Sequence, residues 1–384
     1  MRILHIIGTI SPEAGGPTES VRALLDFGPS RYEHEVVTLD DPAAPFLADF
    51  QVPIHALGPV SSVYAYSDKL VPWLVANRDR FDGVLVNGLW QHCGFAAQRA
   101  LAGHTPYVVF THGMLDPYFK RAFPLKHLKK WLYWLPVEYW VLRRAYRVLF
   151  TCAMEEKLAE ESFWLHRWNP YVVAFGATGP VGDSELQKQT FFDLYPQVRE
   201  RRFLLFLGRI HRKKGCDMLI DAFVKVATEA PGLDLVIAGP DQQQWQSSLM
   251  EIVARAGLSD RVHWTGMLKG DAKWGAFFAS EAFILPSHQE NFGMAVAEAL
   301  ACGRPVLLSD KVNIAPDIAE DGSGLMELDT DEGTLRLLRR WIEMPASERE
   351  AMGQRALATF EQRYDMRANA KAIVRIFEGI QQNA

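Results

Sequence analysis

The chain alternates short apolar runs with segments long enough to form a helix, and this alternation constrains its fold more than any other feature. In the first half, the apolar runs occupy residues 3–10, 34–39, 83–86, 107–111, 148–151 and 172–175. In the second half, they occupy residues 203–207, 233–238, 262–265, 282–285 and 305–309. Because buried strands that alternate with helices form parallel sheets, the pattern predicts an α/β protein.

Two domains are expected from the length of 384 residues, since each half is large enough for its own core. A stretch rich in Gly and Pro at 176–183 predicts a linker. We therefore expect two doubly wound, Rossmann-like domains, at 1–178 and 184–364, that face each other across a cleft. A last helix is expected over 365–384, and the sequence leaves open whether it crosses back to the first domain.

The overall charge and the cysteines exclude several classes of protein. The net charge of −5 and the isoelectric point near 6.1 disfavour binding to nucleic acid. The four cysteines lie far apart, with no spacing typical of a disulfide framework or a zinc site. The N-terminal apolar run is short for a signal peptide, and no apolar stretch reaches the length of a membrane span. We therefore expect an intracellular protein.

The segment 286–298 follows an apolar run, leads into a helical pattern, and carries two glutamates on either side of the expected helix start. A helix that begins near Phe292 and Gly293 leaves its first N–H groups without helical partners, and such groups bind anions. Glu290 and Glu298, one in the loop and one in the helix, can accept hydrogen bonds from hydroxyl groups. The segment therefore predicts a site for a phosphate that is attached to sugars.

The loop 207–215 adds two cations after the first strand of the second half, Arg209 and Lys214. Arginine binds phosphate oxygens in a bidentate manner and lysine adds a compact charge, so the pair predicts neutralisation of a diphosphate without a metal ion. The alternative is a solvated basic turn.

The first half contributes weaker candidates. Gly15 and Gly16 let the backbone approach a ligand closely, although an ordinary tight turn explains them as well. His112 ends a strand and would face the expected cleft; a structural histidine is the alternative. Asp331 precedes a helical pattern, so we interpret it as a charge at a helix N-terminus and not as a metal ligand. No metal site is predicted.

The segment 118–147 combines basic and aromatic residues in an otherwise acidic protein. This composition favours contact with anionic lipid, and the alternative is a buried helix pair with a solvated lysine face. The residues that we expect at this membrane or acceptor surface are Lys120, Arg121, Lys126, Lys129, Lys130, Trp131 and Trp134.

These motifs together resemble the retaining glycosyltransferases of family 4, which have the GT-B fold. The resemblance rests on Arg209 and Lys214 combined with the Glu290–Glu298 spacing, after a Gly15-Gly16 loop and a strand that ends in Thr111-His112-Gly113. It runs the whole length of the chain. The segment 111–117 is similar to bacterial members that build cell-surface polysaccharides, including exopolysaccharides. Residues 175–180 differ from the Asn-Gly pair that the family often has there.

The resemblance implies roles for individual residues. The N-terminal domain would bind the acceptor and the C-terminal domain a nucleotide sugar. Glu290 and His112 would lie at the reacting sugar, and Glu298 would bind the ribose. The remaining donor-binding residues implied are Gly15, Gly16, Arg209, Lys214, Asn291, Phe292, Gly293 and Met294.

The implied activity is transfer of a hexose to a lipid-linked or oligosaccharide acceptor, by a metal-independent front-face mechanism and with no cofactor. Mannose from GDP-mannose is the first choice, and a UDP-sugar donor stays open. The enzyme would work in the cytoplasm, at the inner face of the plasma membrane. The oligomeric state is not predicted.

Other functions compete with this one. A catalytically silent nucleotide-sugar-binding scaffold subunit and a GT-B epimerase would share the fold. A nicotinamide-dependent dehydrogenase is disfavoured because no G-x-G-x-x-G follows a strand.

Overall fold

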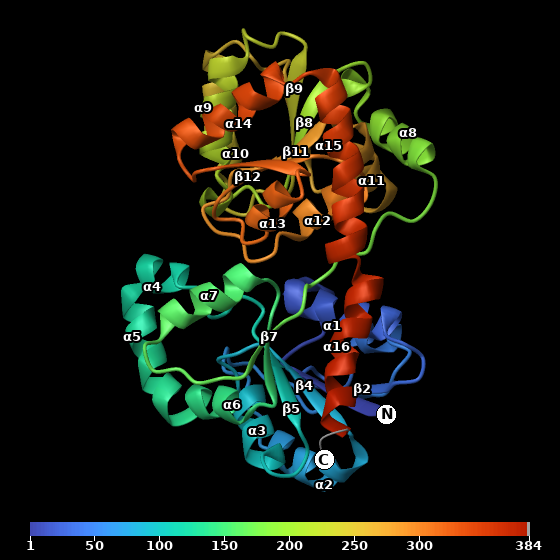
Figure 1. Ribbon diagram of the computed structural model, residues 1–384, viewed down its shortest axis with the longest axis vertical. Coiled ribbons are helices and arrows are strands. Elements are labelled where there is room, and N and C mark those ends of the chain that lie inside the picture. Colours follow the sequence, from blue (N-terminus) through green and yellow to red (C-terminus); the bar gives the residue numbers. More distant parts are fainter. Residues whose placement is uncertain (382–384) are drawn as a thin grey trace. The chain divides into compact units, whose positions relative to one another are not determined.

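The computed structural model describes residues 1–381, apart from a few side chains, and the chain divides into two compact units. The first unit comprises residues 1–175 and the C-terminal helix α16 (Met366–Gln381), and the second comprises residues 176–365. Figure 1 shows α16 beside α1 (Gly16–Phe27), although the two helices are far apart in the sequence. Residues 382–384 of the predicted last helix fall outside the described part.

The first unit is built on a sheet of seven strands in the order β3-β2-β1-β4-β5-β6-β7, and every neighbouring pair is parallel. The strands are β1 (Arg2–Ile7), β2 (Glu33–Thr38), β3 (Ile54–Ala56), β4 (Gly83–Asn87), β5 (Tyr107–Phe110), β6 (Arg147–Phe150) and β7 (Pro170–Val172). The other helices are α2 (Leu70–Asn77), α3 (His92–Leu101), α4 (Tyr118–Ala122), α5 (Pro124–Tyr133), a π-helical turn (Trp134–Glu138), α6 (Tyr139–Arg144) and α7 (Ala153–Ser162).

The central strands are buried on both faces, as expected when helices cover a parallel sheet. All five residues of β4 are buried. A Cβ at Gly83 would lie 2.2 Å from the Phe377 ring, so this glycine lets α16 pack closely on the sheet. The C-terminal helix is therefore an integral part of the first unit.

The second unit is built on a parallel sheet of six strands in the order β10-β9-β8-β11-β12-β13. The strands are β8 (Arg202–Leu207), β9 (Leu233–Ala238), β10 (Val262–Gly266), β11 (Ala282–Leu285), β12 (Val306–Ser309) and β13 (Gly324–Glu327). The helices are α8 (Ser184–Leu194), α9 (Cys216–Val226), α10 (Gln246–Arg255), α11 (Gly270–Ala279), α12 (Met294–Ala301), α13 (Ala315–Glu320), α14 (Asp331–Glu343) and α15 (Ala346–Thr359).

The predicted strands agree with these bounds to within a few residues, and β9 and β11 agree at both ends. Two strands, β3 and β13, were not predicted. Each is only three or four residues long and contains no distinct apolar run. The predicted strand at 172–175 lies instead at 170–172, where it pairs with β6.

Each sheet reverses its strand order once, between β1 and β4 in the first unit and between β8 and β11 in the second. Ligands of open α/β sheets bind beyond the carboxyl ends of the strands at such a switch point. The loops that follow these strands are therefore the places where a site is expected in each unit.

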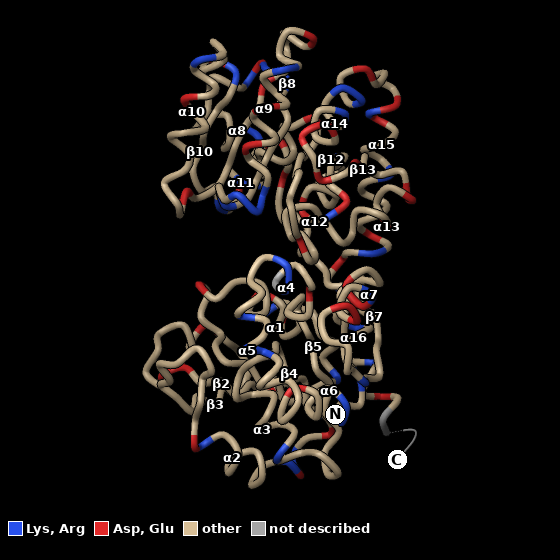
Figure 2. The backbone as a smooth tube through the Cα atoms, turned by 90° about the vertical axis from the view of Figure 1, so that its left-hand side faces the viewer, with Lys and Arg blue, Asp and Glu red and all other residues tan. Residues whose placement is uncertain are grey.

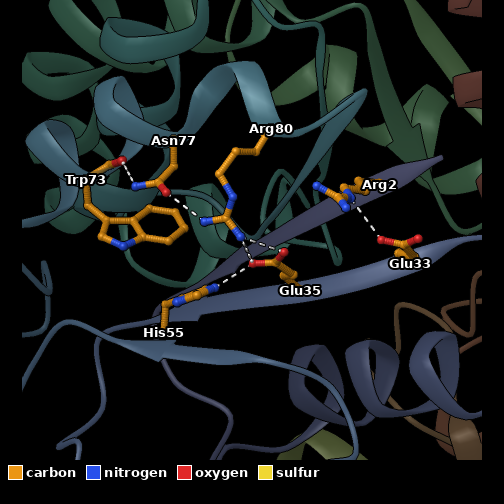
Figure 3. Close-up of polar contacts among 7 residues, drawn as sticks. All are labelled: Arg2, Glu33, Glu35, His55, Trp73, Asn77 and Arg80. Carbon is orange, nitrogen blue, oxygen red and sulfur yellow. Dashed lines mark hydrogen bonds and ion pairs between the residues drawn. The ribbon is translucent and has the colours of Figure 1, made fainter.

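Polar contacts hold the edge of the first sheet (Figure 3). Arg80 donates to both carboxylate oxygens of Glu35, at 2.9 and 3.0 Å, and His55 Nε2 lies 2.6 Å from the same carboxylate. Asn77 accepts from Arg80 and donates to the carbonyl of Trp73. These contacts join β2 and β3 to the segment that follows α2.

A pair of buried histidines makes the first unit sensitive to acid. The His5 Nε2 and His34 Nδ1 atoms lie 3.0 Å apart, and both rings are buried. Burial lowers the pKa of His34 to about 4, and burial together with the charge of His34 lowers the pKa of His5. Both rings are therefore neutral in the fold at neutral pH.

We predict that the fold loses stability as the pH falls from 7 to 5. In the unfolded chain the histidine takes up a proton near pH 6.5, whereas folded His34 does not until about pH 4. The folding free energy that neutral His34 contributes is therefore complete above pH 6.5 and is lost progressively below it. One such group weakens folding by roughly 2 kcal/mol over this range. Urea unfolding at several pH values measures it: H34Q should flatten the dependence, and H104Q, at an exposed position, should not. An unchanged slope in H34Q would contradict the account.

Candidate active site

The loops after β8 and β11 pack tightly against each other at the switch point of the second unit. Gly215 adopts φ +68° just before α9, and a Cβ there would lie 2.0 Å from the Pro286 carbonyl oxygen. Only glycine fits this contact without displacing the backbone. The close approach positions the cations of residues 207–215 beside the loop that carries Glu290.

Lys214 and Glu290 form an ion pair across these two loops. Both side chains are largely buried, with exposed fractions of 17% and 20%. The backbone of Glu290 is held on both sides, because its N–H donates to Lys311 O and its carbonyl accepts from Asn313 N. The carboxylate therefore has a fixed position next to a cation.

Arg209 differs from Lys214 in having an exposed side chain. Its guanidinium makes no ion pair with any residue that the structure describes. It is close enough to His211 to lower the pKa of that ring, after the larger effect of burial. The predicted phosphate-binding pair thus consists of one lysine with a carboxylate partner and one arginine open to solvent.

Helix α12 begins directly after Gly293, which adopts φ +79°. A Cβ there would lie 3.2 Å from Glu290 Cγ, so the glycine allows the Glu290 loop to turn closely into the helix. No side chain caps the first turn, which starts at Met294. Phe292 is buried with its ring edge against Tyr364, and Asn291 accepts from Asn313 at 3.3 Å.

Glu298 has a partner that was not predicted from the sequence. Lys273 on α11 lies 2.9 Å from Glu298 Oε1, and its ammonium is also 4.2 Å from the Trp274 ring centroid. The only sequence signal is that Lys273 lies in the first turn of the helix after β10, at the carboxyl edge of the sheet. A single lysine in that position has no distinctive pattern.

The second unit can therefore bind an anion and hydroxyl groups together. Each of the two glutamates is paired with a lysine, and the positive end of the α12 dipole lies between them in the sequence. A diphosphate would compete with Glu290 for Lys214, which would release the carboxylate to accept hydrogen bonds from hydroxyl groups. His288, in the same loop, is held 2.7 Å from Asp329, and Asp331 begins α14, in the predicted place for a helix N-terminal charge.

In the first unit, His112 follows β5 in a left-handed conformation, with φ +48°. Its ring stacks on Phe110 at 4.2 Å, and Nε2 lies 3.2 Å from Asn87 Oδ1. The Asn87 amide group donates to two backbone carbonyls, so its oxygen faces the imidazole and Nε2 carries the proton. Burial lowers the pKa of His112 to about 3. His112 is thus a neutral ring whose Nδ1 can accept a hydrogen bond.

Glu155, which was not predicted, holds the chain on both sides of His112. One carboxylate oxygen accepts from the Thr111 hydroxyl at 2.6 Å and from Gly113 N at 2.7 Å. The other accepts from the backbone and hydroxyl of Thr151. A glutamate in an amphipathic helix normally indicates a solvated face, so this role could not be predicted from the sequence pattern.

Gly15 ends an exposed loop and Gly16 is the first residue of α1, and no heavy atom lies within 4 Å of a Cβ placed at either position. Gly15 has φ +86° and precedes α1. Asp40 braces the chain before this loop, because it accepts from the Thr9 hydroxyl and from Ile10 N. The loop therefore has room for a ligand next to its backbone.

The predicted surface role of Trp134 is wrong. Its side chain is fully buried, stacks on Phe163 at 4.1 Å and donates to Leu165 O. Trp131 is half-buried and packs against Phe163 too. Lys130 turns inward, with its ammonium 4.2 Å from the Trp90 ring centroid. The helix packs its aromatic face because indole rings bury more apolar area than the leucines on the other face.

The exposed part of this segment consists of leucines and cations. Lys120, Arg121, Lys126 and Lys129 are exposed, and Figure 2 shows basic residues at α4. Four leucines also face solvent, with exposed fractions of 77%, 63%, 78% and 47%: Leu125, Leu128, Leu132 and Leu135. Their spacing of three, four and three residues places them on one helical face. We call these four residues the leucine face. Of the described residues, no helix is both long and apolar enough to traverse a bilayer.

Both units match known protein families. Residues 187–359 match the family described as "Glycosyl transferases group 1", and residues 15–176 match the "Glycosyl transferase 4-like domain". These two segments together include all of the predicted site residues.

Individual proteins also resemble the chain. The lipopolysaccharide core biosynthesis mannosyltransferase LpsB of Rhizobium meliloti is 24% identical over 274 residues, which cover 62% of this chain and 74% of LpsB. Mannosylfructose-phosphate synthase of Agrobacterium fabrum is 32% identical over 116 residues, or 29% of this chain, and the match spans only 26% of that synthase. The solved structure of Anabaena Alr3699/HepE in complex with UDP-glucose covers 100% of both chains, with a TM-score of 0.73 and 19% identity. The likeness confirms the predicted GT-B fold.

We predict that the Glu155 contacts stabilise the first unit. In E155Q an amide N–H₂ would face the N–H of Thr151 or Gly113, so a buried donor would lose its acceptor. The unfolding free energy should fall by about 1–3 kcal/mol in urea denaturation. The control is E160Q, an exposed position on the same helix, which should leave it unchanged. Equal stability of the two variants would contradict the prediction.

Proposed function

The chain belongs to the family 4 glycosyltransferases, and on this premise we propose that it transfers a hexose from a nucleoside-diphosphate sugar to a saccharide acceptor in the synthesis of a bacterial surface polysaccharide. The observation that carries the proposal is the arrangement in the second unit: the Lys214–Glu290 pair, the exposed Arg209 and the uncapped start of α12 follow the two strands at the switch point. Few ligands other than a diphosphate ester of a sugar need cations, helix N–H groups and carboxylates together.

In the proposed donor complex, Arg209 and Lys214 bind the diphosphate, with the backbone of residues 291–294. Glu298 accepts from the ribose hydroxyls, and Glu290 accepts from the hydroxyls of the transferred sugar. Mannose is the first choice for that sugar because LpsB is named a mannosyltransferase. HepE binds UDP-glucose, which keeps a UDP-sugar donor as the second choice beside GDP-mannose.

We propose a front-face reaction that retains the anomeric configuration. The bond between the sugar C1 and the phosphate oxygen breaks, and the acceptor oxygen forms a bond to C1 on the same face. The departing phosphate oxygen takes the acceptor proton. Negative charge develops on the diphosphate, where Arg209, Lys214 and the α12 dipole stabilise it in place of a metal ion. His112, being neutral, acts by accepting a hydrogen bond and not by supplying charge.

The acceptor is proposed to be lipid-linked or an oligosaccharide, with the enzyme in peripheral contact with the anionic inner face of the plasma membrane. The support is the leucine face of α5 and the π-helical turn that follows it, which is flanked by Lys126 and Lys129. Apolar side chains surrounded by lysines match the interfacial region of a bilayer that contains anionic lipids.

Donor binding tests the proposal directly. R209A and K214A should each weaken binding of GDP or UDP by about 10-fold to 100-fold in calorimetry, since each removes a charge-assisted hydrogen bond. K225A, at an exposed lysine on α9, is the matched control and should bind normally. E290A should slow sugar transfer more than it weakens nucleotide binding. Wild-type affinity in both R209A and K214A would sink the site assignment.

A transfer assay separates the proposed enzyme from the alternatives. The protein is incubated with a panel of labelled nucleotide sugars, and released nucleoside diphosphate and altered sugar are quantified. A glycosyltransferase releases the diphosphate by transfer or slow hydrolysis. A silent scaffold subunit binds the donor without releasing it, and an epimerase of this type is recognised by a changed sugar without an acceptor product.

Membrane contact is tested with vesicles. The L128S/L132S double variant should lose about tenfold or more of its binding to phosphatidylglycerol vesicles, because two apolar groups no longer enter the interface. L186S/L194S removes two leucines that are equally exposed on α8, and it should bind as wild type does. Equal loss in both double variants, or no loss in either, would refute the leucine face as the contact.

A further inference from the structure

A row of aromatic rings runs along the loops at the carboxyl end of the first sheet. Its members contact one another in the order Tyr66, His92, Tyr64, Tyr133 and Trp90, with centroid separations of 4.7, 5.9, 5.6 and 6.5 Å. We call it the aromatic row. It draws on three segments that are far apart in the sequence, and it is not part of the donor site described above.

The two ends of the row differ in chemistry. At one end the Tyr66 ring is 60% exposed, although its other side packs on buried His92. At the other end, the Lys130 ammonium lies over the Trp90 ring. Between them, the Tyr133 hydroxyl donates to the Tyr64 hydroxyl at 3.0 Å. The row thus offers an open ring face, two hydroxyl groups and a cation.

The row lies at the switch point of the first unit. Trp90 belongs to the loop after β4, and a Cβ at Gly8, in the loop after β1, would lie 2.6 Å from the Gln91 side-chain oxygen. The Trp90 indole also donates to Met114 O at 3.2 Å, in the turn that begins with His112. Aromatic rings at this place are therefore close to the loop to which we assigned a role in the reaction.

The backbone is strained at two points of the row. Ala65 has φ +54° and Trp90 has φ +67°, a region that residues with a side chain rarely adopt. Such conformations persist only where the surroundings impose them, and they cluster at ligand sites. At Ala65 a backbone hydrogen bond imposes the conformation, since the carbonyl of the preceding residue, Tyr64, accepts from His92 N at 2.8 Å.

At Trp90 the constraint is a buried carboxyl group. Glu138, in the π-helical turn, is fully buried, and its Oε1 accepts from Trp90 N at 2.5 Å. Its Oε2 has no hydrogen-bond partner among the described residues. Burial raises the pKa of Glu138 to about 7, and the nearby Lys130 opposes that change. A carboxyl group that is kept in the core at this cost, with one oxygen unsatisfied, indicates that the Trp90 loop must be held in place.

We propose that the aromatic row and Lys130 bind an oligosaccharide of the acceptor that carries a phosphate group at one end. The sugar at the other end stacks on the open face of Tyr66, the Tyr64 and Tyr133 hydroxyls bond the hydroxyl groups of the sugars between, and Lys130 pairs with the phosphate. This inference rests on the proposed function, because it names the acceptor chemistry for that enzyme. Simple core packing accounts for His92 and Tyr133, but it does not account for an exposed Tyr66 next to strained backbone.

The same helix connects this site to the proposed membrane contact. Lys130 and Tyr133 are on the face of α5 that turns toward the row, whereas Leu128 and Leu132 are on its exposed face. A phosphorylated saccharide could come from solution or from a lipid anchor, and the experiment distinguishes these two sources.

Fluorine NMR on protein labelled with 5-fluorotryptophan tests the proposal, with the Trp90 signal identified from W90F. The probes are trisaccharide 1-phosphates, the corresponding methyl trisaccharides, inorganic phosphate, and trisaccharide phosphates esterified to a short prenol in vesicles. Trisaccharide 1-phosphate should shift the Trp90 signal, and K130Q and Y66A should each weaken that binding by about tenfold. K157Q, at an exposed lysine of α7, and Y171A, at another exposed tyrosine, are the matched controls.

The outcomes are distinct. Tighter binding of the prenol-linked probe assigns the site to a lipid-linked acceptor, and equal binding assigns it to a soluble one. No shift with any trisaccharide phosphate, or the same affinity in K130Q as in K157Q, overturns the proposal. Binding of inorganic phosphate as tightly as trisaccharide phosphate also overturns it, since the rings would then play no part. GDP and UDP binding, measured on the same samples, reports separately on the proposed function.

Discussion

The close contact between the loops after β8 and β11 is the constraint on which the second unit depends. Gly215 has no side chain, so the Pro286 carbonyl can pack against it, and Lys214 then reaches Glu290. The ion pair stabilises two charges that burial alone would penalise. It also keeps a cation and a carboxylate at one switch point, where we propose that they exchange partners when a diphosphate binds. A larger residue at 215 would separate the loops and dismantle the pair.

In the second unit a largely buried ion pair keeps its charges, whereas in the first unit burial keeps the His112 ring neutral. His112 stacks on Phe110 and is hydrogen-bonded to Asn87, so one ring nitrogen can accept a hydrogen bond and the ring carries no charge. Glu155 and Glu138 hold the two neighbouring loops by accepting from backbone N–H groups. These carboxylates fix the positions of other residues. The surfaces that they shape, at the His112 turn and the aromatic row, carry the groups for which we propose binding roles.

The sequence predicted what depends on local pattern. Period and length predicted most strands of both sheets. Motif spacing selected Lys214, Glu290 and Glu298 as candidates, and each of them forms an ion pair in the structure. The sequence could not identify contacts between distant segments, so Lys273 and Glu155 were missed, because each is an ordinary charged residue in a helix. It also assigned Trp134 to the surface, since composition alone cannot tell which face of a helix turns inward. The exposed leucines of α5 follow a visible spacing, and counting it would have found that face.

The cations of the second unit are proposed to bind the diphosphate of a nucleotide sugar. A crystal structure of the protein with GDP or UDP bound tests this. We expect Lys214 to leave Glu290 and bond a phosphate oxygen, with Arg209 on the same diphosphate. This expectation is contradicted if the nucleotide binds elsewhere while Lys214 and Glu290 stay paired.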